Sequence, residues 1–247
     1  MTDIKGVRKM KSIVEHYTPT DQIQVPDHYF EIEIPSWEVV LQPVLNQVAS
    51  QFKTAASETL ELTDDMIRAL GINGVETLQQ FKQYAKSYIE EEQVQMKFYH
   101  DLMPFLLAFH GETADVIINS EEETRYREEY LEQVSAYAEE YDLSLEDYAR
   151  QQLGISGDVD EELAQRAKED YIFKIIAHDR VKAKNIELDE LTYERFIQQN
   201  VLQNGADEID VREQFPYEVF KKIMPEMSYS QSLFEHFKPK FHFKIRG

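Results

Sequence analysis

The segment from Thr77 to Phe109 constrains the fold more than any other, because it contains no glycine and a single proline, Pro104. Apolar side chains recur along it at close to the spacing of an α-helix. They are Leu78, Phe81, Tyr84, Tyr88, Met96, Tyr99, Met103 and Leu106. The pattern predicts one long helix over 77–109, kinked near Pro104, whose apolar stripe packs against other helices.

Helix-start and helix-stop residues divide much of the remaining sequence. Thr63, followed by two aspartates and closed by Gly71, is typical of a capped helix of about two turns. Further helices are predicted over about 39–52, 120–141, 144–154, 158–184, 188–202, 207–224 and 230–237, with breaks at Pro216 and Pro225. With 8 glycines and 8 prolines in 247 residues, the composition also favours helix. The predicted fold is therefore mainly α, built of several helical arms.

Two segments near the ends alternate apolar and polar residues, as strands do. They are His28–Ile34 and Lys240–Arg246. A lone strand leaves its backbone groups unpaired, so we expect these two to pair in a small sheet, with their apolar side chains against a helix. Residues 1–27, which contain a cluster of four basic residues between Lys5 and Lys11 and the breakers Pro19 and Pro26, are predicted to be a tail, and residues 28–247 a helical domain.

Charge excludes several classes of partner. The chain carries 47 acidic and 26 basic residues, a net charge of −21. Such a surface repels nucleic-acid phosphates and anionic membranes, so we expect neither as a partner. There is no cysteine, which excludes disulfide and thiol chemistry. Because Met1–Tyr17 shows no signal-peptide pattern and no stretch approaches about 20 apolar residues, the cytoplasm is the expected compartment.

Sequence patterns that support catalysis or cofactor binding are weak. Gly154 and Gly157 lack the spacing and lysine of a phosphate-binding loop, and fit a turn between helices better. The acidic run that starts at Asp158 lacks the glycine and distal glutamate of a calcium loop. His178 and Asp179 are adjacent on a helix, so their side chains do not face each other. We therefore expect no enzyme activity, no cofactor and no metal.

Aromatic residues give a more informative pattern. Five tyrosines recur at spacings of about one and two helical turns, at Tyr126, Tyr130, Tyr137, Tyr141 and Tyr148. One interpretation is a core that packs helices together. The other is a partly open apolar groove, since tyrosine and methionine side chains adapt to varied partners. The sequence leaves both interpretations open.

Three segments in succession carry a resemblance to a known family. They begin at Leu62-Thr-Asp-Asp-Met-Ile-Arg-Ala-Leu-Gly-Ile72, at Ile118-Asn-Ser-Glu-Glu-Glu and at Glu162-Leu-Ala-Gln-Arg-Ala-Lys. The second segment ends in a Leu-Ser-Leu-Glu-Asp-Tyr run at Tyr148, and the third continues to Leu191. Over roughly residues 61–200, their order and spacing resemble the C-terminal, client-cradling domain of the bacterial chaperone trigger factor. The resemblance implies helical arms of the trigger factor and SurA-like type.

The sequence also departs from that family. Trigger factor carries a ribosome-docking domain and an inserted prolyl isomerase domain, and the 60 residues before Leu62 cannot hold both. The family's docking loop reads G-F-R-x-G-K, whereas the run from Gly6 to Lys11 lacks the phenylalanine and the second glycine. We therefore expect neither ribosome docking nor isomerase activity.

The resemblance implies an ATP-independent chaperone, or holdase, that cradles unfolded or nascent polypeptide segments. The alternative is a dedicated interaction module that binds one folded partner through the same cradle. The residues expected to contact a client are Met103, Phe105, Phe109, Tyr130 and Tyr137.

Overall fold

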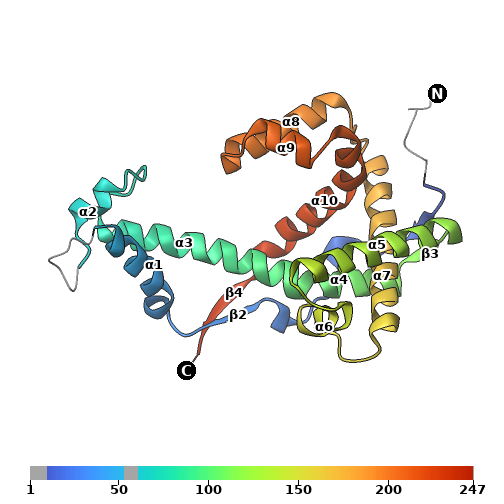
Figure 1. The fold of residues 1–247 in the computed structure, drawn as a ribbon, viewed down its shortest axis with the longest axis horizontal. Helices are drawn as coiled ribbons and strands as arrows, with labels where there is room; N and C mark the ends of the chain where they lie inside the picture. Colours follow the sequence, from blue (N-terminus) through green and yellow to red (C-terminus); the bar gives the residue numbers. More distant parts are fainter. Residues whose placement is uncertain (1–9, 53–60, 247) are drawn as a thin grey trace. The chain divides into compact units, whose positions relative to one another are not determined.

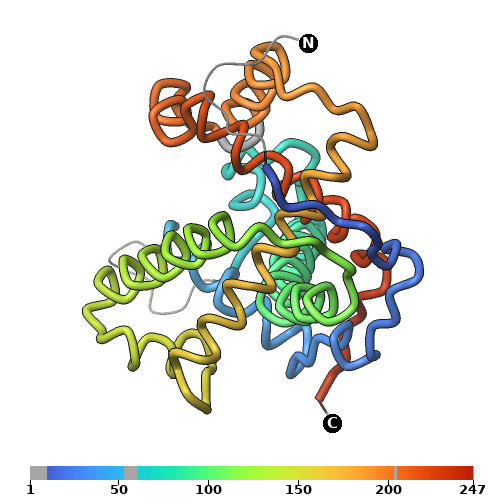
Figure 2. The backbone as a smooth tube through the Cα atoms, turned by 90° about the vertical axis from the view of Figure 1, so that its right-hand side faces the viewer, coloured from blue at the N-terminus to red at the C-terminus, as the bar shows by residue number. Residues whose placement is uncertain are grey.

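The computed structural model describes residues 10–52 and 61–246 and is mainly helical, as the sequence predicts (Figure 1). The chain divides into two compact units, each built from segments distant in sequence. Figure 2 traces the course of the chain by colour from the N-terminus to the C-terminus. Unit 1 combines the described residues up to Ile23 with Phe105–Leu233. Unit 2 combines Gln24–Pro104 with the described residues from Phe234 onward. The division therefore does not follow the predicted boundary between a tail and one domain.

In its described residues, unit 2 contains three complete α-helices, α1 (Trp37–Gln51), α2 (Asp64–Ala69) and α3 (Leu78–Lys97). It also contains the first two residues of α4 (Met103–Thr113) and the last turn of α10 (Tyr217–Phe237). The predicted N-cap at Thr63 is confirmed, since its side chain accepts a hydrogen bond from the Met66 amide. Thr77 caps α3 in the same way and forms a capping box with Gln80. A core cluster of Val48, Ile67, Val75 and Phe81 joins α1, α2 and α3.

A turn of π-helix, η3 (Phe98–Leu102), separates α3 from α4. Its cause is Pro104, which has no N–H to donate and whose ring would clash with the carbonyl of His100 in an ordinary α-helix. Widening the preceding turn relieves that clash, and the Met103 amide bonds to the Phe98 carbonyl, five residues back. The predicted irregularity near Pro104 is thus present as a π turn, and the helix continues to Thr113.

The predicted pairing of the two end segments is confirmed within unit 2. Strand β2 (Glu31–Ile34) pairs in parallel with β4 (His242–Ile245), with Glu31 opposite His242 (Figure 1). The side chains of Ile32 and Ile34 are buried, as expected. Ile245 is 58% exposed, so the prediction that it faces a helix is wrong, because the apolar cover does not reach the last residue of β4.

Aromatic rings form the core beneath this sheet. Phe98 and Phe237 are fully buried, and Phe30 and Phe234 nearly so. The Phe98 and Phe234 rings meet edge to face with centroids 5.2 Å apart, a favourable aromatic geometry. The Phe30 ring lies 6.0 Å from that of Phe237. This cluster connects β2 with η3 and the last turns of α10 (Tyr217–Phe237).

Unit 1 contains a second small sheet and a set of long helices. Strand β1 (Ile13–His16) pairs antiparallel with β3 (Asp115–Ile117). The helices are α5 (Ser120–Glu140), α6 (Leu145–Gln151), α7 (Val159–Ala183), α8 (Glu190–Asn204), α9 (Glu208–Gln214) and most of α10. Helices α5 and α7 cross and pack against each other (Figure 1). The cap of α5 is Asn119, one residue before the predicted Ser120.

Pro216 and Pro225 have different effects on the last two helices, α9 and α10. Pro216 separates α9 from α10, as predicted. Pro225 lies inside α10, so the predicted break there is wrong. A proline removes one backbone hydrogen bond from a helix, and here the burial of Phe220, Tyr229 and Leu233 on either side of Pro225 holds the helix together.

The N-terminal segment is anchored in unit 1 and is not a free tail over residues 10–23. The Glu122 carboxylate, 8% exposed, accepts hydrogen bonds from the amides of Lys11 and Ser12, each at 2.9 Å. It also accepts from the hydroxyls of Ser12, at 2.9 Å, and Tyr171, at 3.2 Å. The Ser12 hydroxyl oxygen in turn accepts from the Asn119 amide at 2.9 Å. One carboxylate thereby holds β1 against α5 and α7.

Replacing Glu122 should destabilise unit 1. Glu122→Gln leaves donors of Lys11, Ser12 and Tyr171 without a charged acceptor, and hydrogen bonds to a buried charge are worth about 1.5–3 kcal/mol each. We expect a loss of roughly 2–3 kcal/mol in the free energy of unfolding, measured by urea denaturation. The control is Glu121→Gln, which changes an exposed neighbour and should cost less than about 0.5 kcal/mol.

The Glu122 contribution should also depend on pH. Burial alone raises the pKa of this carboxyl, but the hydrogen bonds from Lys11, Ser12 and Tyr171 outweigh it and the pKa is lowered. A carboxyl whose pKa is lowered by folding stabilises the folded state at any pH above its pKa in the unfolded chain, which is about 4.3. This stabilisation is lost as the pH falls through the pKa of the carboxyl in the folded protein. The stability difference between wild type and Glu122→Gln should therefore be constant from about pH 6 to pH 5 and shrink below about pH 4. A difference that grows on acidification would contradict this assignment.

Candidate functional site

Half-buried polar side chains tie the helices of unit 1 together. The Tyr126 hydroxyl on α5 donates to Asp170 on α7 at 2.5 Å. Lys174, one turn further along α7, ion-pairs with Glu226 on α10 at 2.7 Å, and its ammonium lies 5.0 Å from the Tyr126 ring. Burial raises the pKa of both carboxyls, Asp170 and Glu226. These four side chains fix the orientation of α5, so the role of Tyr126 is helix packing.

Histidines in unit 1 are also engaged in packing. His110 Nε2 lies 2.9 Å from the Tyr229 hydroxyl, and burial followed by the nearby Arg180 charge lowers the pKa of His110 to about 4. Burial, with Lys174 and Lys182, lowers the pKa of His178 to about 4 as well. Both imidazoles are therefore neutral near pH 7. Among the described residues, no three His, Asp or Glu side chains converge as metal ligands would.

Four of the five predicted contact residues are half-buried. Met103, Phe105 and Phe109 lie on α4, and the Phe105 and Phe109 rings are 6.3 Å apart. Tyr130 packs against a core cluster formed by Val134, Ala149, Ile155 and Leu163. Tyr137, two turns further along α5, is 43% exposed. Both sequence interpretations thus apply to the tyrosine stripe, core at Tyr130 and open surface at Tyr137.

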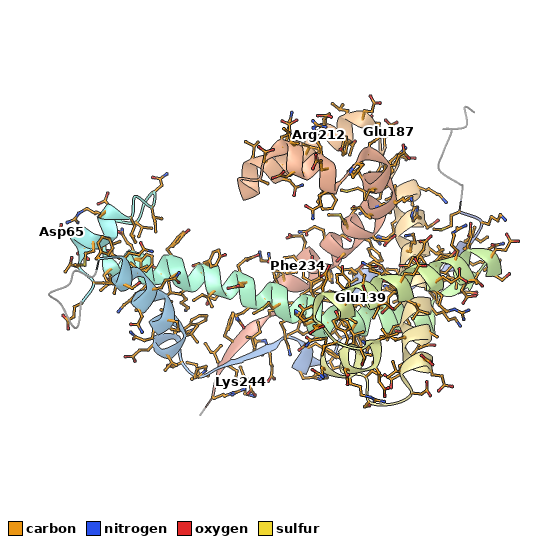
Figure 3. All side chains as sticks on the ribbon, viewed as in Figure 1. Asp65, Glu139, Glu187, Arg212, Phe234 and Lys244 are labelled. Atoms are coloured by element: carbon orange, nitrogen blue, oxygen red, sulfur yellow. The ribbon has the colours of Figure 1, made fainter. Side chains whose placement is uncertain are left out.

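The open part of that stripe continues to the end of α5. Tyr141 is 59% exposed, and its ring lies 5.7 Å from that of Tyr148 on α6. We call Tyr137, Tyr141 and Tyr148 the α5 patch. Glu139, labelled in Figure 3, is one of the exposed carboxylates between them. The patch therefore combines aromatic area with an acidic surround.

A second exposed stripe runs along α3 into η3 in unit 2. Tyr84 and Tyr88, one turn apart, are 50% and 65% exposed, and Tyr99 is 48% exposed. The sequence places these residues on the stripe expected to be buried. The buried face is offset from it and consists of Phe81, Ala85, Val94, Phe98 and Leu102. We call Tyr84, Tyr88 and Tyr99 the α3 patch.

Helices α8, α9 and α10 present a third set of exposed apolar side chains. These are Leu191, Leu202, Ile209 and Val219. Behind them, a core of Tyr193, Phe196, Ile197, Val211 and Phe220 holds the three helices together. Arg212, labelled in Figure 3, binds Glu194 through both guanidinium nitrogens at 2.9 and 2.6 Å. The exposed residues are thus displayed on a well-packed support.

The sequence signals for these surfaces are incomplete. Helical periodicity identifies Tyr84 and Tyr88 as members of one face, but not whether another element covers that face. Leu202 and Ile209 lie on either side of the Asn204-Gly205 helix stop. Large apolar residues so close to a turn are the sequence signal from which their exposure could have been predicted.

Comparison of the chain with protein-family models, with curated proteins and with solved structures found no match in any of the three. In the described residues, no helix is long and apolar enough to cross a membrane. The function therefore has to be argued from the surfaces themselves.

Single serine substitutions should separate core from surface on α5. Tyr137→Ser removes a side chain that is 43% exposed and should change the free energy of unfolding by less than about 0.5 kcal/mol. Tyr130→Ser removes a ring packed on the Val134–Leu163 cluster and should cost roughly 2–3 kcal/mol. Urea denaturation of both variants tests this, and equal costs would show that the two tyrosines have the same environment.

Proposed function

We propose that this protein is an ATP-independent chaperone that holds unfolded or partly folded polypeptide segments on exposed apolar faces of its helices. The observation that carries the proposal is the exposure of large, adaptable side chains, mostly tyrosines, at three places on otherwise packed helices. They are the α5 patch, the α3 patch and the exposed residues of α8–α10. The sequence resemblance to the trigger factor cradle supports the same function, and we propose the cytoplasm as its compartment.

The chemistry of the patches suits clients without a common sequence. A tyrosine ring offers apolar area at little cost in side-chain entropy, and its hydroxyl can remain hydrated. The net charge of −21 keeps a protein with such exposed area soluble and limits its self-association. Both properties are required of a holdase that must remain monodisperse while its binding surfaces are open.

The expected affinity is modest. Covering a half-exposed tyrosine removes on the order of 100 Å² of apolar area, which is worth ~2–3 kcal/mol at ~25 cal/mol per Å². A client that covers a few such residues gains roughly 6–9 kcal/mol, and ordering the flexible chain offsets part of this. Binding in the micromolar range with fast exchange follows, so a client can leave and fold without a motor.

The purified protein should suppress the aggregation of several unrelated unfolded proteins in the absence of nucleotide, measured by light scattering. The double variants Tyr84→Ser with Tyr88→Ser, and Tyr137→Ser with Tyr141→Ser, should each need a several-fold higher concentration for the same protection. Because these side chains are exposed, the melting temperature should change little. Gln83→Ser, which shortens an exposed polar side chain beside Tyr84, is the matched control and should protect like wild type.

The range of clients decides between this proposal and a dedicated interaction module. A chaperone protects unrelated clients, whereas a dedicated module co-purifies with one folded protein and protects none of the others. If wild type protects no client at stoichiometric excess, the holdase proposal is wrong.

A further inference from the structure

An open groove of about 500 Å³ lies in unit 2, between β2 and the helix formed by α3 and η3. Glu31, Ile32 and Glu33 of β2 line one wall, together with His28, which precedes the strand, and Arg246, which follows β4. Successive side chains of a strand point to opposite faces, so three consecutive lining residues place the groove along the edge of β2 and not on one face of the sheet.

That edge has no strand partner among the described residues. The His242 amide donates to the Phe30 carbonyl at 3.0 Å and the Arg246 amide to the Ile34 carbonyl at 2.9 Å, so the even-numbered residues of β2 direct their backbone toward β4. Backbone direction alternates along a strand, and the N–H and C=O groups of Glu31 and Glu33 therefore point away from β4, along the groove side. In the described part of the chain, no third strand pairs with β2.

The opposite wall is one face of the helix. Its lining residues are Gln93, Met96, Lys97, His100 and Asp101. The last two belong to the π turn, which widens the helix at this point. Met96 is 42% exposed and supplies an adaptable apolar contact. A free strand edge facing a helix across an open groove has the geometry in which proteins accept an extended peptide as an added strand.

We propose that this groove binds an extended polypeptide segment, which pairs through its backbone with the free edge of β2 as a third strand. The inference rests on the proposed function and names how clients are held at this site. The segment is proline-free and alternates apolar with basic or uncharged residues. Its apolar side chains continue the face of Ile32 and Ile34, which is buried.

Charge and size define this occupant. The Glu31 and Glu33 side chains share the other face of the sheet, where Glu31 pairs with Lys244, labelled in Figure 3, at 3.2 Å and Glu33 pairs with Arg246 at 3.0 Å. A strand added beyond β2 places its side chains on that face beside the same carboxylates, which favours basic residues and disfavours acidic ones. The four residues of β2 and the groove volume suit a segment of about three or four residues.

Peptides with modified backbones provide the first test. The probe is a short fluorescein-labelled peptide that alternates valine and lysine, followed by fluorescence anisotropy. N-methylation removes an amide N–H, and backbone direction alternates, so methylating one alternate set of residues should weaken binding about tenfold or more while methylating the other set leaves it nearly unchanged. If both methylated peptides bind as tightly as the parent, the segment does not pair as a strand and the proposal is overturned. Replacing lysine by glutamate should weaken binding, and equal affinity would overturn the charge argument.

Variants of β2 provide the second test. Glu33→Pro removes an N–H that points into the groove and leaves the pairing with β4 intact, since proline is tolerated at a free strand edge. Glu33→Ala, the matched control, loses the same carboxylate but keeps the N–H. We expect Glu33→Pro to weaken binding of the parent peptide about tenfold relative to Glu33→Ala, with amide exchange of β4 used to confirm that the sheet persists. Equal binding by the two variants would place the peptide elsewhere.

Client protection by the same proteins separates this inference from the proposed function. Peptide pairing without any suppression of aggregation by wild type would overturn the holdase function and leave the strand-binding groove standing. Suppression of aggregation by wild type that binds neither the parent peptide nor its methylated forms would overturn the groove and leave the holdase function standing.

Discussion

The hydrogen bonds of the buried Glu122 carboxylate hold unit 1 together, because they join three elements that are far apart in sequence. The carboxylate oxygens accept from the amides of Lys11 and Ser12, just before β1. They also accept from the Tyr171 hydroxyl, which ties α5 to α7. Desolvating a carboxylate is costly unless several donors compensate for it, and here backbone amides and hydroxyls do so. Unit 2 is joined differently, by parallel pairing of β2 with β4 over an aromatic core. In both units, a strand near one end of the described chain pairs with a strand that is distant in sequence.

The local elements were largely predictable from sequence, whereas elements that depend on distant partners were not. Caps at Thr63, Ser144 and Asp158 lie where the sequence places them, because an N-cap is a contact within one turn. The β2–β4 pairing was predictable from alternation in both segments. Strand β1 was not, because Ile13–His16 is short and is held by Glu122, over a hundred residues later. Pro225 shows the converse, since tertiary burial overrides a local breaker.

The candidate surfaces likewise depend partly on local sequence and partly on distant segments of the chain. Periodicity identifies which side chains share a helix face, but the exposure of that face depends on what the rest of the chain places over it. Tyr84 and Tyr88 fit a core stripe by spacing and are exposed, whereas Tyr130 fits a binding stripe and is half-buried. Burial is hardest to predict from sequence for tyrosine, since its ring packs well in a core and its hydroxyl is readily hydrated at the surface. The groove beside β2 could not be predicted, because it requires a free strand edge and a helix from separate segments.

The two proposed binding surfaces would recognise different features of a polypeptide. The tyrosine patches would contact side chains, and their affinity would rise with the apolar area that a client exposes. In the proposed complex, the edge of β2 would contact the backbone, which every extended segment shares. The flanking carboxylates of Glu31 and Glu33 would add a preference for basic residues without a defined sequence. A folded protein hides most of its apolar side chains and has few free strand-forming segments, so it offers little to either surface. A protein with both surfaces therefore distinguishes unfolded from folded chains by physical state and not by sequence, and releases a client as the client's own folding removes the groups that were bound.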